Sequence, residues 1–315
     1  MPPPIAYTGL GFRVWRPVVR GPEGLDQPDP LRCFLAESAW RATMHEQPKV
    51  VVVGHARSGT SLLYGRLRAS LPEALGFFEP ADPAFLEQAR ETPQAVVAKL
   101  LLPVNGDMTA QLGAVFSRRL FLVRDPRDVL VSALLYVGGF EVMWRWEESR
   151  IARALALLGR KEAEPAAVGL LELFDAMRDG FSLEHISASL QLIEDFLAAQ
   201  EESHPFFVVR YEDLLAGNTQ ALERVLGFAL APGVALESGL ERVARTAGVA
   251  SWRRWCTPAD VTILQPLLEA PLQRFGYDAA DWRLEPPTPI PTHHASAYVR
   301  RLIDERRAQE QWRGA

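Results

Sequence analysis

The segment Val50–Leu63, VVVVGHARSGTSLL, restricts the fold of this chain more than any other stretch. Four β-branched residues end at Gly54, a short polar turn follows, and the next residues are apolar with helical spacing. This order predicts a buried parallel strand, a phosphate-binding loop and the first turn of a helix. An ordinary strand-turn-helix with a Gly-Ser turn is the alternative interpretation.

The loop resembles only part of an ATP-binding P-loop. Gly54 and Gly59 have the glycine spacing of that motif, but Thr60 stands where it requires lysine. Without that lysine, transfer of a γ-phosphoryl group lacks one charge-stabilising group. The loop can still bind a phosphate through its backbone N–H groups, with Arg57 as its cation. Hydroxyl ligands are expected from Ser58, Thr60 and Ser61.

Composition narrows the class of protein. The chain is 48% hydrophobic and 23% charged, as is typical of a soluble globular protein, and its net charge of -5 does not favour nucleic acid. Cys33 and Cys256 have no metal-binding spacing, and the histidines form no ligand pattern. No apolar run reaches the roughly 18 residues of a membrane span. We therefore expect a cytoplasmic protein without a membrane span, a nucleic-acid partner or a metal site.

Three further apolar runs, each followed by a helical pattern, predict buried strands over 95–102, 119–123 and 206–209. Alternating strands and helices predict an α/β fold with three layers, a central parallel sheet flanked by helices. We expect a Pro-rich arm with a helix over 31–43 in residues 1–48, and the main domain over 49–283. A Pro-rich linker and a helical tail follow over 284–315.

The remaining segments are less regular. Residues 136–200 are expected to form a helical substrate region whose first part, to about Gly180, is the least regular of the chain. An amphipathic helix is predicted over 182–200. Asn218 is expected to cap a further helix, and another is predicted from Pro266 to Phe275. The charged helix expected over 295–312 is interpreted as a surface or oligomer element, a homodimer being one arrangement.

Two charged residues stand in apolar surroundings. Lys99 interrupts the run AVVAKLLL, so its ammonium group must pair, reach the surface or extend to a site at the end of the strand. Glu79 follows two aromatic residues and precedes Pro80. A turn acid and a site residue are equally compatible with that position.

The third apolar run leads directly into VRDPRDVLVS. Asp125 suits a helix N-cap and Pro126 the first helical position, so Arg124 falls at the carboxyl end of a strand beside a helix start. Ligands of parallel sheets bind at this edge. Arg124 and Ser132 therefore suggest a second phosphate site. A capped helix entry, with Asp128 close to the backbone N–H groups, is the alternative.

Taken together, four stretches resemble the sulfotransferases that use 3′-phosphoadenosine 5′-phosphosulfate (PAPS). These stretches are HARSGTSLL at 55–63, VRDPRDVLVS at 123–132, VRYEDLL at 209–215 and RTAGVASW at 245–252. The resemblance implies the P-loop-like topology of that family and a donor with two separate anionic groups, without a metal ion. The roles it implies are 5′-phosphosulfate binding by Arg57, Ser58, Gly59, Thr60 and Ser61, 3′-phosphate binding by Arg124, Ser132 and Arg245, and further donor contacts from Tyr211 and Trp252.

The resemblance departs from the cytosolic branch of the family at the catalytic base. That branch has a histidine in a KTHLP-like segment, where this chain has Leu101 in KLLLP. Other branches, including bacterial, carbohydrate and tyrosylprotein types, use a glutamate downstream of the first loop. Glu79 fits that placement and His55 is the competing base, while Arg57 and Lys99 are expected to stabilise the leaving group.

The expected activity is therefore sulfuryl transfer to a hydroxyl of a small molecule, lipid or carbohydrate. A P-loop kinase of a small molecule and a non-catalytic binding module with the same fold are the alternatives. The identity of the acceptor does not follow from the sequence.

Overall fold

The computed structural model describes residues 47–104, 106–199, 205–234 and 248–314. The expected arm and its helix over 31–43, Cys33 and the predicted ligand Arg245 lie outside the described residues. All described residues belong to one unit of the chain, His45–Ala315.

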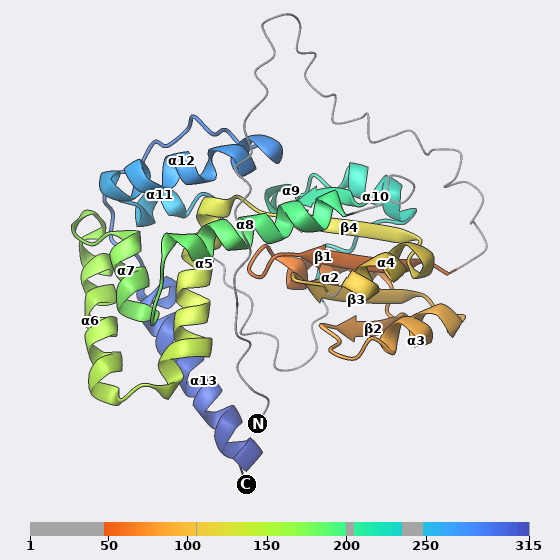
Figure 1. Cartoon of the computed structure of the whole chain (residues 1–315), viewed down its shortest axis with the longest axis horizontal. Coiled ribbons are helices and arrows are strands. Elements are labelled where there is room, and N and C mark those ends of the chain that lie inside the picture. The colour runs from red at the N-terminus through yellow and green to blue at the C-terminus, as the bar shows by residue number, and fades with distance from the viewer. Residues whose placement is uncertain (1–46, 105, 200–204, 235–247, 315) are drawn as a thin grey trace, which may run out of the picture. The chain divides into compact units, whose positions relative to one another are not determined.

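A sheet of five parallel strands lies at the centre of this unit, in the order β2-β3-β1-β4-β5 (Figure 1). The strands are β1 (Lys49–Gly54), β2 (Leu75–Phe78), β3 (Val96–Leu101), β4 (Arg118–Val123) and β5 (Phe207–Arg210). The predicted α/β fold is confirmed, and all four predicted strands are present. Because the strands are parallel, the loops after β1 and β4 and the end of β2 open at the same edge of the sheet.

Alternate residues of the strands pack into two different cores. Val50 and Val52 contact one group of buried side chains, while Val51 and Val53 contact another on the opposite face. The first core includes residues of α2 (Thr60–Ser70), α9 (Tyr211–Ala216) and α10 (Gln220–Leu226). The second includes residues of α3 (Phe85–Glu91), α4 (Gly106–Val115) and α8 (Leu183–Ala198). Helices therefore cover both faces of the sheet, which gives the three expected layers.

A third core lies among helices alone. It contains buried residues of α5, α6, α7, α11, α12 and α13, and of the π-helix η3. The bounds of these elements are α5 (Pro126–Tyr136), η3 (Val137–Val142), η4 (Met143–Arg145), α6 (Glu148–Ala163), η5 (Pro165–Ala167), α7 (Leu170–Met177), α11 (Trp252–Trp255), α12 (Pro258–Arg274), η7 (Thr292–His294) and α13 (Ser296–Gly314). α5 joins this helical layer to the sheet, because its first residues follow β4 directly.

The structure adds one strand and corrects the starts of two helices. The segment 75–78 pairs with β3 as an edge strand, and most of 136–180 is helical, in line with the helical region expected over 136–200. Thr257 caps α12 by accepting a hydrogen bond from the N–H of Asp260, so that helix begins eight residues before Pro266. Thr219, and not Asn218, precedes the first residue of α10.

The C-terminal helix also differs from its interpretation as a surface element. Val299, Leu302 and Ile303 of α13 are fully buried in the third core. No helix among the described residues is both long enough and apolar enough to cross a lipid bilayer.

Candidate functional site

The loop between β1 and α2 is a tight turn held by its own backbone. The N–H and the hydroxyl of Ser58 both donate hydrogen bonds to the carbonyl of His55, at 3.2 and 2.7 Å. Gly59 has φ of +101° and Arg57 has φ of +69°. A left-handed conformation at a residue other than glycine costs on the order of 1–3 kcal/mol and is concentrated at functional sites. Arg57 is therefore held in place against a local conformational preference.

The first turn of α2 presents backbone donors at the carboxyl end of β1. The N–H groups of Leu62 and Leu63 bond to the carbonyl of Gly59, whereas those of Thr60 and Ser61 precede the first intrahelical bonds. Such donors and the positive end of the helix dipole favour an anion. Thr60 is buried and Ser61 is partly exposed. The predicted order of strand, loop and helix is present, and phosphate binding by the loop stays a prediction.

The Arg57 side chain is surrounded by groups from α5 and α13. Its Nε donates to the Ser132 hydroxyl at 3.1 Å, and its guanidinium carbon lies 4.1 Å from the centre of the Tyr136 ring. The guanidinium also hydrogen-bonds to the hydroxyl of Tyr298. Burial lowers the pKa of Arg57, the two tyrosines raise it, and the charge of Arg124 lowers it. Two guanidinium groups in one region raise the local positive potential, which would favour an anion.

Arg124 lies directly after β4 and reaches the same loop. Its guanidinium carbon is 4.5 Å from the centre of the Tyr211 ring, and its Nη1 donates to the carbonyl of Arg57 at 3.4 Å. Asp128 lies 3.9 Å from Nη2. Within the described part of the chain, the buried Nε of Arg124 has no hydrogen-bond partner. A buried donor without a partner is costly, so an anionic ligand at this position would satisfy it.

Gly59 and the Tyr211 ring touch, which fixes the ring beside the loop. A Cβ atom added at Gly59 would lie 2.3 Å from Cδ2 of Tyr211, far closer than van der Waals contact. Any larger residue at position 59 must displace the ring. Tyr211 therefore forms a side wall of the β1–α2 loop.

We expect Gly59→Ala to weaken binding of a phosphorylated nucleotide by about 30-fold, since the displaced ring and the strained φ each cost on the order of 1 kcal/mol. Gly217→Ala is the matched control, because Gly217 has φ of +77° but open space around its Cβ position. Isothermal titration calorimetry on both variants separates strain from the steric effect. Equal affinities for the two variants would remove Tyr211 from the site.

A second charged cluster lies at the ends of β2 and β3. The Lys99 ammonium group donates to Glu79 Oε1, while the N–H of Glu79 bonds to the Lys99 carbonyl at 2.9 Å. The Lys99 side chain is 3% exposed and that of Glu79 is 40% exposed. Burial lowers the pKa of Lys99, Glu79 raises it, and Arg57 lowers it. Glu79, with φ of +49°, thus presents a carboxylate to solvent from the same region as Arg57.

His55 is partly buried at the start of the loop. Its Nδ1 lies 2.8 Å from the carbonyl oxygen of Ala56, and a carbonyl can only accept, so Nδ1 carries the proton. Burial lowers the pKa of His55, which opposes protonation near neutral pH, and the hydrogen bond to Ala56 acts in the other direction. Its Nε2 is then the basic nitrogen.

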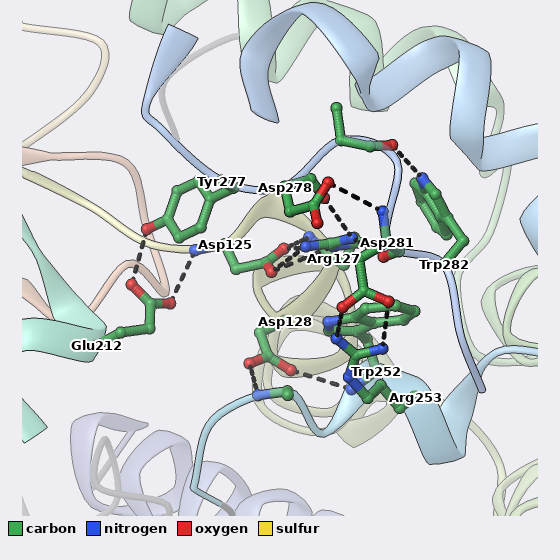
Figure 2. Close-up of polar contacts among 12 residues, drawn as sticks. Asp125, Arg127, Asp128, Glu212, Trp252, Arg253, Tyr277, Asp278, Asp281 and Trp282 are labelled. Atoms are coloured by element: carbon green, nitrogen blue, oxygen red, sulfur yellow. Dashed lines mark hydrogen bonds and ion pairs between the residues drawn. The ribbon is translucent and has the colours of Figure 1, made fainter. Parts of the chain in front are cut away.

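Other charged groups at the start of α5 have structural roles. Arg127 is paired with Asp125, with Nη2 2.7 Å from Oδ2. Figure 2 shows this pair between the segments that carry Trp252 and Trp282, whose rings the guanidinium contacts. Asp125 caps α5, as predicted. Asp125 and Arg127 therefore form the capped, salt-bridged helix entry that was the alternative interpretation.

Asp128 was expected to lie close to the N–H groups at the start of its own helix. The hydrogen bonds of its carboxylate are instead to residues 250–252. Its carboxylate accepts from the N–H of Ala250 and Trp252 and from the Ser251 hydroxyl, at 2.7 to 3.0 Å (Figure 2). Burial raises the pKa of Asp128, and Arg124 lowers it. These bonds tie the segment after residue 247 to α5, with Ala250 at φ of +57°.

Trp252 is fully buried in this stack. The guanidinium carbons of Arg127 and Arg253 lie 4.2 and 4.5 Å from its ring centre, and Trp282 packs edge-on against it. Its observed contacts are thus within the protein, and a donor contact by Trp252 stays a prediction.

Two residues near the loop were not singled out from the sequence. Tyr298 lies in the C-terminal helix α13, which had been interpreted as a surface or oligomer element, and Glu141 lies in η3. The Glu141 side chain reaches solvent, yet nearby protein atoms desolvate its carboxyl and raise its pKa, while Arg178, Arg57 and Arg306 lower it. Glu79 is also close enough to raise it. Neither residue lies in a motif, and only long-range packing brings them to the loop.

The structure thus brings most of the predicted site residues to one edge of the sheet. Those near the β1–α2 loop are His55, Arg57, Ser58, Gly59, Thr60, Ser61, Glu79, Lys99, Arg124, Ser132 and Tyr211. In the described ranges, no group of three or more His, Cys, Asp or Glu side chains is arranged to hold a metal ion.

Comparisons with known proteins were made on both sequence and structure. No protein-family model and no curated protein matches the chain. Among solved structures, mouse sulfotransferase SULT7A1 complexed with PAP is 12% identical, with a TM-score of 0.44 over 72% of this chain and 84% of that one. The sulfotransferase domain from the curacin biosynthetic pathway is 15% identical, with a TM-score of 0.29 over 82% of this chain and 98% of that domain.

Proposed function

We propose that this protein is a sulfotransferase that moves a sulfuryl group from PAPS to a hydroxyl group of an acceptor. One observation carries the proposal. Arg57 and Arg124, which follow β1 and β4, meet at the N-terminus of α2 beside the Tyr211 ring. Two cationic groups, helix donors and an aromatic ring suit a nucleotide that carries anionic groups at two positions.

The residues present fit such a donor. The backbone N–H groups of Gly59, Thr60 and Ser61 would hold the 5′-phosphosulfate of PAPS. When bound there, PAPS would supply an activated sulfuryl group. Arg124, whose Nε has no partner among the described residues, would bind the 3′-phosphate. Ser132 accepts from Arg57 and keeps its own hydroxyl proton to donate, so it would connect the two anion sites.

Glu79 would act as the general base. Its exposed carboxylate takes the proton from the acceptor hydroxyl as that oxygen bonds to sulfur and the bond from sulfur to the phosphate oxygen breaks. The products are a sulfate ester and 3′-phosphoadenosine 5′-phosphate (PAP). Lys99 and Arg57 stabilise the negative charge that develops on the phosphate oxygen. Lys99 also keeps Glu79 in place, because the two side chains are hydrogen-bonded.

A ligand comparison tests this function directly. We expect PAP to raise the melting temperature by several degrees, since a ligand at 100 times its Kd stabilises by about 2.7 kcal/mol. ATP with Mg²⁺ should produce little shift. Turnover of PAPS is then assayed against a panel of alcohols, phenols and sugars. Stabilisation by ATP–Mg²⁺ alone would indicate a kinase, whereas PAP binding without transfer to any acceptor would indicate a binding module.

A further inference from the structure

The C-terminal helix α13 is built into the helical core beside the site. Val299, Leu302 and Ile303 are fully buried, and α13 packs against α5, η3 and η4. Gly139 of η3 permits this close approach, because a Cβ there would lie 3.1 Å from the Val299 carbonyl. In Figure 1, α13 passes next to α5, the helix that also carries Ser132.

Further polar contacts hold α13 at both its start and its middle. The N–H of Ser296 donates to Glu162 Oε1 at 2.6 Å. Arg307 donates to the carbonyls of Trp144 and Trp146, each at 2.9 Å. The helix is therefore anchored on both sides of Tyr298. A side chain projecting from this part of α13 is held in a defined position relative to the β1–α2 loop.

Tyr298 uses that position to contact Arg57. Its side chain is buried, and because a guanidinium group has only donors, the tyrosine hydroxyl is the acceptor of the hydrogen bond between them. Together with the Ser132 hydroxyl and the Tyr136 ring, Tyr298 surrounds the guanidinium with groups from two helices. All three groups are uncharged. They orient the guanidinium without neutralising the charge that an anion would meet.

An arginine in this loop needs such support. Its long side chain loses about 2 kcal/mol of conformational freedom when it is fixed in one rotamer. Arg57 also has a left-handed backbone, and Arg124 repels its charge. Hydrogen bonds to charged groups are stronger than neutral ones, so each hydroxyl opposes these costs effectively.

We propose that Tyr298 is a positioning residue for Arg57, so that the C-terminal helix takes part in the chemistry of the site. The proposal rests on the proposed function, in which Arg57 stabilises the departing phosphate oxygen. Tyr298 touches neither reactant. It acts by holding the Arg57 guanidinium in one orientation beside the β1–α2 loop.

The test is a double-mutant cycle between Tyr298→Phe and Arg57→Met. We expect Tyr298→Phe to lower kcat by about tenfold, the low end for loss of one hydrogen bond to a charged group, with the KM for the acceptor unchanged. In the Arg57→Met background the same change should alter kcat by less than about twofold, because the contact no longer exists. Equal losses of kcat in both backgrounds, or an unchanged kcat in the single variant, would overturn the proposal.

Leu302→Ala is the matched structural control. It weakens the packing of the same helix through a cavity but leaves the hydroxyl of Tyr298 in place. This variant should have a lower melting temperature and a normal kcat at a temperature where it is folded. If Leu302→Ala lowered kcat as much as Tyr298→Phe does, any weakening of the packing of α13 would lower kcat. That result would also overturn the proposal. The wild-type protein is titrated with PAP in parallel: absence of binding refutes the proposed function, whereas binding with an additive cycle refutes only the role of Tyr298.

Discussion

Glu79→Gln is expected to lower turnover of PAPS by about 10²- to 10⁴-fold, the usual contribution of a positioned base. Glutamine keeps the size of the side chain and an oxygen that can accept the hydrogen bond from Lys99. It cannot take a proton from the acceptor. Because Glu79 does not belong to the β1–α2 loop, the affinity for PAP should stay within about threefold of wild type.

Two neighbouring groups are the rival bases, and each can be tested separately. His55→Gln removes the basic Nε2, and Glu141→Gln removes a carboxyl whose pKa is raised by burial. If Glu141 were the base, activity would be lost as the pH falls through a value above the ordinary glutamate range, since its ionised form would disappear there. If His55 were the base, the loss would occur below the ordinary histidine range, because its pKa is lowered. Near-normal turnover of Glu79→Gln would refute the Glu79 assignment.

The sheet and the loop could be predicted because their signals are local. Strands buried on both faces read as continuous apolar runs, and Val50–Val53 is such a run. The edge strand β2 lacks this signal and was missed, because its four residues are only partly buried and form no comparable apolar run. Asp125 and Pro126 identified the start of α5 through capping chemistry, which depends on neighbouring residues alone.

Contacts between distant segments could not be predicted. Arg57 and Ser132 were assigned to separate anion sites, yet their side chains are hydrogen-bonded across 75 residues of sequence. The first part of 136–200 was expected to be the least regular of the chain, whereas Gly139 lies in the π-helix η3, where α13 approaches closely. Tyr298 carries no local sign of its contact with Arg57. Each of these features depends on the tertiary packing of helices that are far apart in the sequence. Local sequence patterns do not reveal that packing.

Arg124→Ala is expected to weaken binding of PAP by about 10²-fold and binding of adenosine 5′-phosphate by less than about threefold. The difference is the 3′-phosphate, and loss of a buried charged partner costs on the order of 2–5 kcal/mol, where 1.4 kcal/mol is a factor of ten. Arg124 is placed for this contact by β4 and by stacking on Tyr211. Calorimetric titration of both nucleotides gives the ratio directly.

The variant has one structural cost, and the same strand offers a control for it. Removing Arg124 leaves the buried Asp128 without the cation 3.9 Å away, although its bonds to Ala250, Ser251 and Trp252 persist. Arg118→Ala removes the same type of side chain from the amino end of β4, so nucleotide affinity should not change. Arg124→Lys keeps the charge but loses the planar stacking, and it should show an intermediate loss. Equal losses for the two nucleotides in Arg124→Ala would place Arg124 away from the 3′-phosphate, because its effect would then be on the fold or on the 5′ end of the nucleotide.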